Sequence, residues 1–363
     1  MTLGDTTGLL YINTVRFIRL SIINLFSRLL FKNKTNYTKI LINRDGAFGD
    51  SVVALPALSL IRQKYPKAQI DLLSINDGNI SFKEVGLNEG LINNIISTKK
   101  NHRKKTLMRL KKENYDLFIQ IPQNIGIYKS IRNMLLVRFY LKTRSAFGWD
   151  CGRIKSFMRL QKEHFVIPTE TNRFIKVLQK HDIAGEPSYP ISPQEPHDPT
   201  VRQFLSSQQP IVFLIGGKLQ PKKWPINNWV TLANLIGGQN KILILGGTDE
   251  KIEADEIVSQ TKNAINWCGK LSIPELHYVL TKSSIAISLD TGAMHLCDAA
   301  KLKTIALFST RDLSNKWWPN NKSSIVIEKV LPCSFCLKTV CSDNICMTNI
   351  KPNEVYAAFK KLI

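Results

Sequence analysis

The chain lacks the sequence features that mark several common protein classes. None of its 363 positions begins a run of eighteen or more uninterrupted apolar residues, so we expect no membrane-spanning helix. No G-x-G-x-x-G motif follows either predicted first strand, which argues against a dinucleotide-dependent oxidoreductase. A zinc-finger or RNA-binding signature is also missing, and nucleic acid is therefore not an expected partner.

Acidic residues are scarce relative to basic ones. Asp and Glu number 28 against 50 Lys and Arg, which gives a formal net charge of +22. The basic residues gather in the N-terminal half, in a block over residues 99–112 and a looser group over residues 129–159. Such a surface concentrates anionic partners, for example acidic lipid headgroups or a phosphorylated glycan. We therefore expect an acidic partner or substrate at a membrane.

Residues 1–38 precede the first predicted domain. Within residues 9–31, apolar side chains recur at helical spacing and are interrupted by Arg16, Arg19 and Arg28. This pattern predicts a basic amphipathic helix. Two interpretations stay open: the helix lies in the headgroup layer of a membrane, or it packs on the body of the domain. The arginines and the lack of an A-x-A-like site argue against a cleaved signal peptide.

Short apolar runs alternate with helical stretches along the rest of the chain. They lie at residues 39–44, 70–75, 94–97, 116–121, 211–215, 242–245, 285–289 and 304–308, and a helix is predicted from about residue 51 to 64. This rhythm predicts parallel sheets covered by helices on both faces. Five prolines within residues 185–199 mark a linker. We expect two doubly wound α/β domains, residues 39–190 and 200–350, with ligands at the carboxyl ends of their strands.

The segment Asp290-Thr291-Gly292-Ala293-Met294-His295 follows the apolar run 285–289. A strand, a turn of small residues and a helix together form an anion site, because the first backbone N–H groups of a helix are unpaired and lie at the positive end of its dipole. The pattern thus predicts a bound phosphate or diphosphate and a nucleotide-type ligand. The alternative is that Asp290 and Thr291 only cap the helix.

Other candidates for ligand binding follow neighbouring strands. Gly216 and Gly217 come after the first strand of the second domain and permit a tight turn near phosphate. Asp249 and Glu250 come after the next strand, where either carboxylate is a candidate acceptor of hydrogen bonds from ribose hydroxyls. A solvated surface role explains each of them equally well. Their shared position at strand ends favours binding for the group.

The first turn of the first domain, residues 43–51, contains a candidate for acid–base chemistry. Asp50 lies at the mouth of a helix, where it is a candidate general base for an acceptor hydroxyl. Its alternative role is the N-cap of that helix. Arg44, Gly49 and Ser51 in the same turn are candidates for acceptor binding, and Gly49 allows close approach of the backbone.

Four of the seven cysteines fall within fourteen residues, at Cys333, Cys336, Cys341 and Cys346. This spacing is compatible with zinc or an iron–sulfur cluster, but it lacks the paired CxxC arrangement over a longer loop that is typical of zinc sites. We favour a cross-linked or simply packed loop. The other three are expected to be buried small hydrophobic residues: Cys151, Cys268 and Cys297.

These motifs resemble glycosyltransferase family 9, the group that contains the bacterial lipopolysaccharide heptosyltransferases. The similarity runs from about residue 39 to the C-terminus. Its specific pieces are residues 49–58, the segment Lys222-Lys223-Trp224-Pro225, residues 288–296 and the cysteine-rich stretch 333–347. Residues 1–38 are not explained by the resemblance, since family members commonly begin at the first strand.

The resemblance implies a GT-B fold, in which two Rossmann-like domains face each other across a cleft and the C-terminal helix, residues 351–363, packs back on the first domain. It implies inverting sugar transfer without a metal or other cofactor. Asp50 is then the base, and Lys222 neutralises charge on the diphosphate. Asp290, Thr291, Gly292 and His295 would surround the nucleotide and sugar.

The expected activity is transfer of a sugar, heptose from ADP-heptose, to a lipopolysaccharide core or related lipid-linked acceptor. The expected location is the cytoplasm, at the cytoplasmic face of the inner membrane. Three alternatives to this activity stay open. The first is a family 9 transferase that uses another nucleotide sugar, and the second is a nucleotide-sugar epimerase of the same architecture. The third is a non-catalytic nucleotide or glycan sensor in which Asp50 is only a cap.

Overall fold

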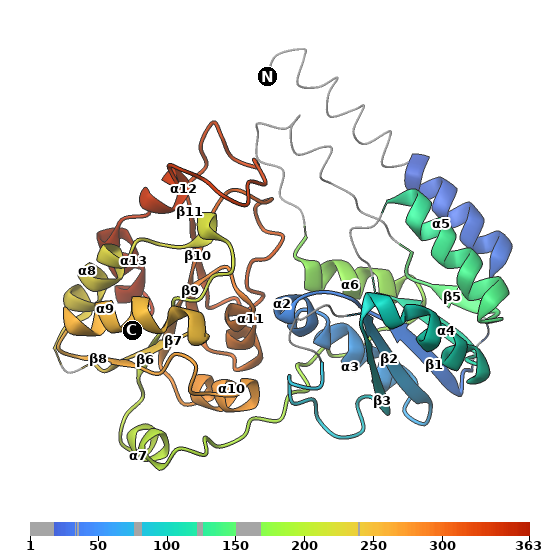
Figure 1. Cartoon of the computed structure of the whole chain (residues 1–363), viewed down its shortest axis with the longest axis horizontal. Coiled ribbons are helices and arrows are strands. Elements are labelled where there is room, and N and C mark those ends of the chain that lie inside the picture. The colour runs from blue at the N-terminus through green and yellow to red at the C-terminus, as the bar shows by residue number, and fades with distance from the viewer. Residues whose placement is uncertain are drawn as a thin grey trace. The chain divides into compact units, whose positions relative to one another are not determined.

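The computed structural model describes residues 18–32, 34, 36–75, 82–121, 126–149, 168–238 and 240–363. The chain divides into two units (Figure 1). Unit 1 comprises Met1–Phe165 and Glu170–Pro190, and unit 2 comprises Val166–Thr169 and Ile191–Ile363. The division after Pro190 lies inside the proline-rich stretch, where few backbone N–H groups are available to continue a regular element.

Unit 1 is built on a five-stranded parallel sheet with the order β3-β2-β1-β4-β5. Its strands are β1 (Lys39–Asn43), β2 (Gln69–Ile75), β3 (Asn94–Thr98), β4 (Leu117–Gln120) and β5 (Ser145–Phe147). In the central strand, Leu41 joins a core cluster with Phe118 of β4. Its neighbours Ile40 and Ile42 point to the other face and are also fully buried. Both faces of the sheet are therefore covered, as predicted.

After β1, the helices described in unit 1 are α2 (Phe48–Val52), α3 (Leu55–Lys64), α4 (Arg103–Lys112), α5 (Ile127–Leu135), its π-helical continuation η2 (Leu136–Tyr140) and α6 (Glu170–Gln179). Two of them directly follow β1, none is described between β2 and β3, and the short turn η1 (Lys100–His102) precedes α4. The single helix predicted over residues 51–64 is wrong, because α2 ends at Val52 and α3 starts at Leu55. Pro56 explains the break. It lies in the first turn of α3, where its missing N–H leaves no hydrogen bond unmade.

Unit 2 contains a six-stranded parallel sheet with the order β11-β10-β9-β6-β7-β8. Its strands are β6 (Ile211–Leu214), β7 (Ile242–Leu245), β8 (Ala264–Asn266), β9 (Ile285–Leu289), β10 (Lys303–Phe308) and β11 (Ile325–Glu328). Its longer helices are α7 (Pro199–Ser207), α8 (Ile226–Ile236), α9 (Lys251–Ser259), α10 (Ile273–Thr281), α11 (Gly292–Ala299) and α13 (Pro352–Lys360). Short turns of helix are η4 (Gln220–Lys222), η5 (Thr248–Glu250) and α12 (Ile345–Thr348). Every residue of β6, β7 and β9 is buried, as a sheet covered on both faces requires.

Within unit 2, the C-terminal helix α13 packs against α8. Val355 and Phe359 belong to the hydrophobic core of this unit. Trp224 connects the turn before α13 to the same core, because its indole N–H donates a hydrogen bond to the Ile350 carbonyl at 2.9 Å. The sequence shows that this helix has an apolar face, but it does not show which partner covers that face.

Residues 18–30 form a helix, which is the described part of the helix predicted over residues 9–31. Ile23 and Phe31 are buried in the core cluster that also contains Met134 of α5. This helix therefore packs on unit 1, in agreement with one of the two interpretations of the pattern. Within the described ranges, no helix is long and apolar enough to cross a bilayer.

Gly148, which follows β5, is expected to be essential for the packing of unit 1. Its φ is +91°, and a Cβ atom there would lie 1.9 Å from the backbone carbonyl oxygen of Gln120. Gly148→Ala should lower the free energy of unfolding by about 2 kcal/mol or more, because backbone strain and a backbone clash add. Gly90→Ala is the matched control, with φ +77° and nothing within 4 Å; it should cost about 1 kcal/mol. Urea denaturation of both variants measures the difference, and equal losses would contradict the packing argument.

Candidate active site

Each sheet has a switch point where neighbouring strands send their following loops in opposite directions. In unit 2 these strands are β6 and β9, and in unit 1 they are β1 and β4. The loops that leave such a pair open a crevice at the carboxyl ends of the strands, which is where ligands bind in open α/β sheets. The residues that follow these four strands are therefore the candidates for ligand binding and catalysis.

The start of α11 in unit 2 is arranged as an anion site. Thr291 occupies the N-cap position with an extended backbone, and its side chain makes no capping hydrogen bond. The alternative that Asp290 and Thr291 serve as side-chain caps is therefore not what the structure shows. Because no side chain caps the first turn of α11, its backbone N–H groups and the positive end of its dipole are left for an anionic ligand.

Lys222 lies at this same edge of the sheet. Its ammonium nitrogen Nζ is 2.5 Å from Asp290 Oδ2, and the two side chains are only 17% and 7% exposed. Lys222 also acts on Asp312, which follows β10. Burial by itself raises the pKa of Asp312, but Lys316, the Leu313 N–H group and Lys222 outweigh it, so the pKa lies below its usual value. Lys222 is thus a cation held among carboxylates at the mouth of α11.

His295 belongs to the same site. It is 3% exposed, and its ring centroid lies 6.2 Å from that of Trp317. The indole N–H of Trp317 donates to Asp312 Oδ2 at 3.3 Å, and Lys316 Nζ lies 3.6 Å from the same oxygen. Sequence reasoning missed Asp312, Lys316 and Trp317. The available signal was that they follow the strand at residues 304–308, which pairs with the strand that ends at Leu289.

The two glycines after β6 have different neighbours: Gly216 lies against the turn after β7, and Gly217 lies near Lys223 and Leu289. A Cβ atom at Gly216 would be 3.5 Å from Glu250 Oε2, so the Glu250 carboxylate lies next to Gly216. Glu250 is 9% exposed, and its Oε2 accepts the Gly247 N–H at 2.9 Å. Asp249 is exposed to solvent. The two neighbouring carboxylates therefore differ, since Glu250 supports the turn while Asp249 is open to a ligand.

Asp50 in unit 1 is a fixed but accessible carboxylate. It is the third residue of α2, whose N-cap is Ala47, so the N-cap role considered for Asp50 is wrong. Its Oδ2 accepts the Ala47 N–H at 2.9 Å, and its Oδ1 accepts from Arg44 Nη2 at 3.1 Å. The side chain remains 31% exposed. Each carboxylate oxygen retains a free lone pair, so the group can still accept a proton from a ligand hydroxyl.

The surroundings of Asp50 depend on Arg44 and Gly46. Arg44 is 2% exposed, and its guanidinium carbon lies 4.7 Å from the ring centroid of Phe174. Burial lowers the pKa of Arg44, while Asp50 and Glu170 oppose this shift. Gly46 has φ +153°, and a Cβ atom there would lie 2.4 Å from Asp50 Cβ. Gly46 is thus the glycine that this turn requires.

The remaining acceptor candidates are placed differently. Gly49 lies inside α2, where its carbonyl accepts the Val53 N–H at 3.0 Å. Ser51 is 2% exposed, and its hydroxyl donates to the Ala47 carbonyl at 3.4 Å. Both residues therefore shape the turn around Asp50, and the hydroxyl of Ser51 faces inward.

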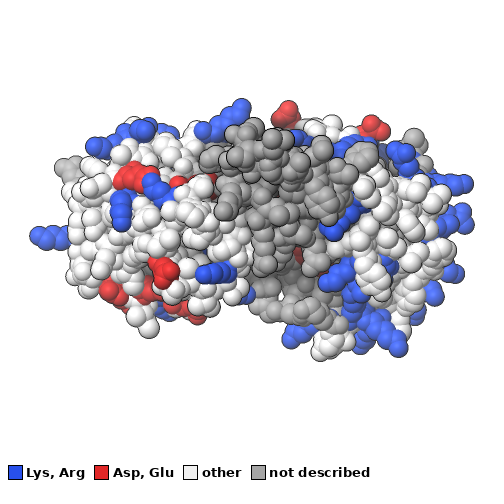
Figure 2. All heavy atoms as spheres, turned by 90° about the horizontal axis from the view of Figure 1, so that it is seen from above, with Lys and Arg blue, Asp and Glu red and all other residues white. Residues whose placement is uncertain are grey.

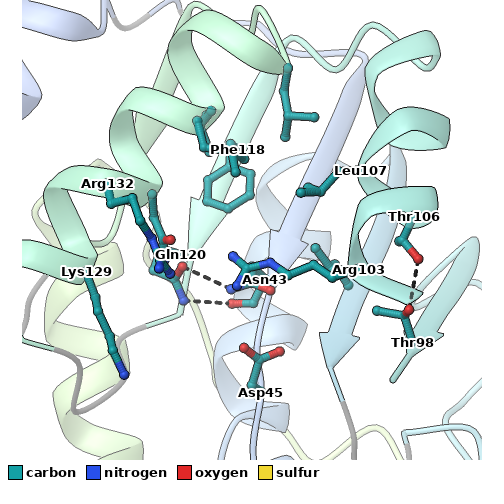
Figure 3. A pocket seen from close by; sticks show the side chains of 15 residues that line it. Asn43, Asp45, Thr98, Arg103, Thr106, Leu107, Phe118, Gln120, Lys129 and Arg132 are labelled. Atoms are coloured by element: carbon teal, nitrogen blue, oxygen red, sulfur yellow. Dashed lines mark hydrogen bonds between the residues drawn. The ribbon is translucent and has the colours of Figure 1, made fainter. Parts of the chain in front are cut away.

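A pocket of about 430 Å³ opens at the switch point of unit 1. Asn43 ends β1 and Gln120 ends β4, and Asn43 Nδ2 donates to Gln120 Oε1 at 3.0 Å. Figure 3 shows Arg103 of α4 and Arg132 of α5 extending toward this pair from opposite sides. The charged residues that line the pocket are Asp45, Arg103, Lys129 and Arg132. The pocket is thus positively charged overall, and its shape and hydrogen bonds were not predictable from the basic blocks of the sequence.

The cysteine-rich stretch holds free thiols. Cys333 and Cys336 are exposed, and Cys341 and Cys346 are partly buried. The described residues include no group of three or more His, Cys, Asp or Glu side chains placed to hold a metal ion. The cross-linked alternative is not present either, whereas Cys268 and Cys297 are buried as expected. Cys151 lies outside the described residues.

Comparison with known proteins identifies the family of the chain. A family model described as glycosyltransferase family 9 (heptosyltransferase) matches residues 103–346. The chain is similar to lipooligosaccharide heptosyltransferase 2 of Campylobacter jejuni, with 25% identity over 90% of this chain and 98% of that protein. It is also similar to lipopolysaccharide heptosyltransferase 1 of Pseudomonas aeruginosa, with 24% identity over 84% of this chain and 87% of that one.

Solved structures share the fold. A family 9 glycosyltransferase from Veillonella parvula superimposes with a TM-score of 0.68 at 18% identity, covering 91% of this chain and 98% of that one. An E. coli heptosyltransferase solved with ADP-2-deoxy-2-fluoro heptose superimposes with a TM-score of 0.60 at 19% identity, covering 89% and 99%. The predicted GT-B class, with two Rossmann-like parallel-sheet units, is confirmed.

Proposed function

We propose that this chain, which belongs to glycosyltransferase family 9, transfers heptose from ADP-heptose to the core of a lipopolysaccharide or a related lipid-linked glycan. The observation that carries the proposal is the position of Lys222, 2.5 Å from Asp290 at the uncapped start of α11. A buried cation beside a helix N-terminus, at a strand switch point, fits a nucleoside diphosphate. The names of the similar heptosyltransferases support heptose as the sugar.

The donor is assigned to unit 2. Its diphosphate would be held by the N–H groups of the first turn of α11 and by Lys222. When the bond between the anomeric carbon and the diphosphate oxygen breaks, ADP leaves with the electron pair. Lys222 and the α11 dipole oppose the negative charge that develops there, and stabilisation of this kind is often the largest contribution to catalysis. No step of this scheme requires a metal ion.

The base is assigned to Asp50. Its carboxylate would take the proton of the attacking acceptor hydroxyl while the hydroxyl oxygen bonds to the anomeric carbon. Attack opposite to the departing ADP inverts the configuration at that carbon. The hydrogen bonds from Arg44 and Ala47 hold the carboxylate in one orientation, which is what a general base within reach of a bound hydroxyl needs.

The acceptor is assigned to the pocket of unit 1. Arg103, Lys129 and Arg132 outnumber Asp45 along its lining, so the pocket suits a sugar that carries carboxylate or phosphate groups. Arginine is well fitted to such groups because its planar fork donates two parallel hydrogen bonds. Because the acceptor is lipid-linked, we place the enzyme at the cytoplasmic face of the inner membrane.

Donor identity is tested by calorimetric titration with ADP-heptose, ADP, UDP, GDP and CMP. We expect ADP-heptose to bind, unchanged by EDTA, and Lys222→Met to weaken binding by about tenfold or more, since a hydrogen bond to a charged group is lost. Lys223→Met is the matched control, because Lys223 pairs with Glu253 at 2.6 Å instead. Preference for another nucleotide would redirect the donor, and no nucleotide binding would favour a sensor.

Asp50→Asn should lower kcat by about a factor of 10² to 10⁴ while leaving ADP-heptose affinity unchanged, because the base acts on the acceptor. ADP release in the presence of acceptor gives the rate, and near-ultraviolet circular dichroism checks that unit 1 stays folded. Full turnover by a folded Asp50→Asn enzyme would refute the assignment of the base. Sugar conversion without any acceptor would favour an epimerase.

Arg103→Gln should raise the KM for an acidic glycan acceptor by about tenfold, because a charge-assisted contact in the pocket is removed. Donor affinity should not change. Lys104→Gln is the matched control on the same helix, since Lys104 is exposed and does not line the pocket. If both substitutions change KM equally, the effect comes from net charge and not from the pocket.

A further inference from the structure

The helix over residues 18–30 buries one face and exposes another apolar face. Ile23 is 1% exposed and anchors the helix in the core of unit 1. Five large apolar side chains remain exposed: Ile18, Ile22, Leu25, Phe26 and Leu29. Their spacing of three and four residues places them along one side of the helix. Leu25 and Leu29 are 57% and 74% exposed, which is unusual for neighbouring large apolar residues on a protein surface.

The adjacent α5–η2 helix carries a second exposed apolar set. Tyr128, Leu135 and Phe139 are 77%, 42% and 66% exposed. Figure 1 shows the helix over residues 18–30 beside α5, and both contribute to one core cluster through Ile23 and Met134. The two sets therefore lie on neighbouring helices of unit 1. We call them together the apolar face.

The chain around the apolar face carries charge of one sign. Residues 18–32 and 126–149 contain no Asp or Glu, and their basic residues are Arg19, Arg28, Lys32, Lys129, Arg132, Arg138, Lys142 and Arg144. Lys and Arg also predominate over Asp and Glu in the part of unit 1 visible in Figure 2. A surface that combines large apolar side chains with cations matches the acyl boundary and the anionic headgroups of a lipid leaflet.

We propose that the apolar face docks unit 1 on an anionic lipid bilayer, with Leu25, Phe26 and Leu29 inserted at the acyl boundary. The docking proposal rests on the proposed function in one respect, namely that the acceptor is linked to a lipid. The helix α5 connects the two roles, because Lys129 and Arg132 line the acceptor pocket while Tyr128, Leu135 and Phe139 belong to the apolar face. Docking thus brings the acceptor pocket to the surface from which its glycan projects.

The test is co-sedimentation of the full chain with vesicles of phosphatidylethanolamine and phosphatidylglycerol, and with vesicles of phosphatidylcholine alone. We expect binding to the anionic vesicles that decreases with added salt. The double variant Leu25→Ser/Leu29→Ser should bind them at least about tenfold more weakly, since two apolar side chains no longer insert. Its melting temperature should match that of the wild type, because both side chains are already exposed.

The matched control is Ile252→Ser/Val340→Ser, which removes two similarly exposed apolar side chains of unit 2, 81% and 75% exposed. It should bind vesicles like the wild type. Equal vesicle binding by the Leu25→Ser/Leu29→Ser protein, or none by the wild type, would overturn the proposal. Dissociation of a wild-type dimer by the same substitutions without lipid, with vesicle binding unchanged, would show that a second copy covers the face. ADP-heptose titration of each variant tests the proposed function separately.

Discussion

The parallel pairing of β6 with β9 is the constraint on which the candidate donor site of unit 2 depends. Ile211 pairs with Ile285 and Leu214 with Ser288, so the two strands end at nearly the same level. The chain then leaves them in opposite directions, and Lys222, after β6, pairs with Asp290, after β9. Pairing of β10 with β9 brings Asp312 to the same edge. Strand pairing, and not proximity in the sequence, therefore brings these residues together at one edge of the sheet.

The two candidate ligand sites balance charge in different ways. In unit 2, Lys222 pairs with Asp290 and Lys316 with Asp312, so these two cations and two carboxylates balance each other. The carboxylate of Asp290 keeps the partly buried ammonium group of Lys222 paired. An incoming diphosphate would compete with Asp290 for this ammonium group. The pocket of unit 1 has an excess of cations and is open to solvent, so it attracts an anionic ligand before contact.

Asp50 shows how rigid support and access are combined. Arg44 is held by Phe174 on one side and by Asp50 on the other, so a buried cation fixes the carboxylate from the protein side. Gly46 leaves room for the carboxylate because it has no Cβ. The solvent side of Asp50 remains open.

The sequence by itself determined the α/β class and the approximate positions of most strands, and it predicted the candidate anion site at the start of α11. These follow from local patterns, because buried strands require continuous apolar runs and the start of a helix binds anions through its own backbone. The motifs at Asp50, Lys222 and Asp290 also identified the family.

Only the tertiary structure decided which distant residues meet. Asp312 and Trp317 join the candidate donor site through the pairing of β10 with β9, and the pocket of unit 1 is lined by side chains from β1, β4, α4 and α5, among others. The partner of α13 and the exposed side of the helix over residues 18–30 were also undetermined, because an amphipathic pattern specifies that a face will be covered without specifying by what. Contacts between elements far apart in sequence depend on sheet order, which no local pattern encodes.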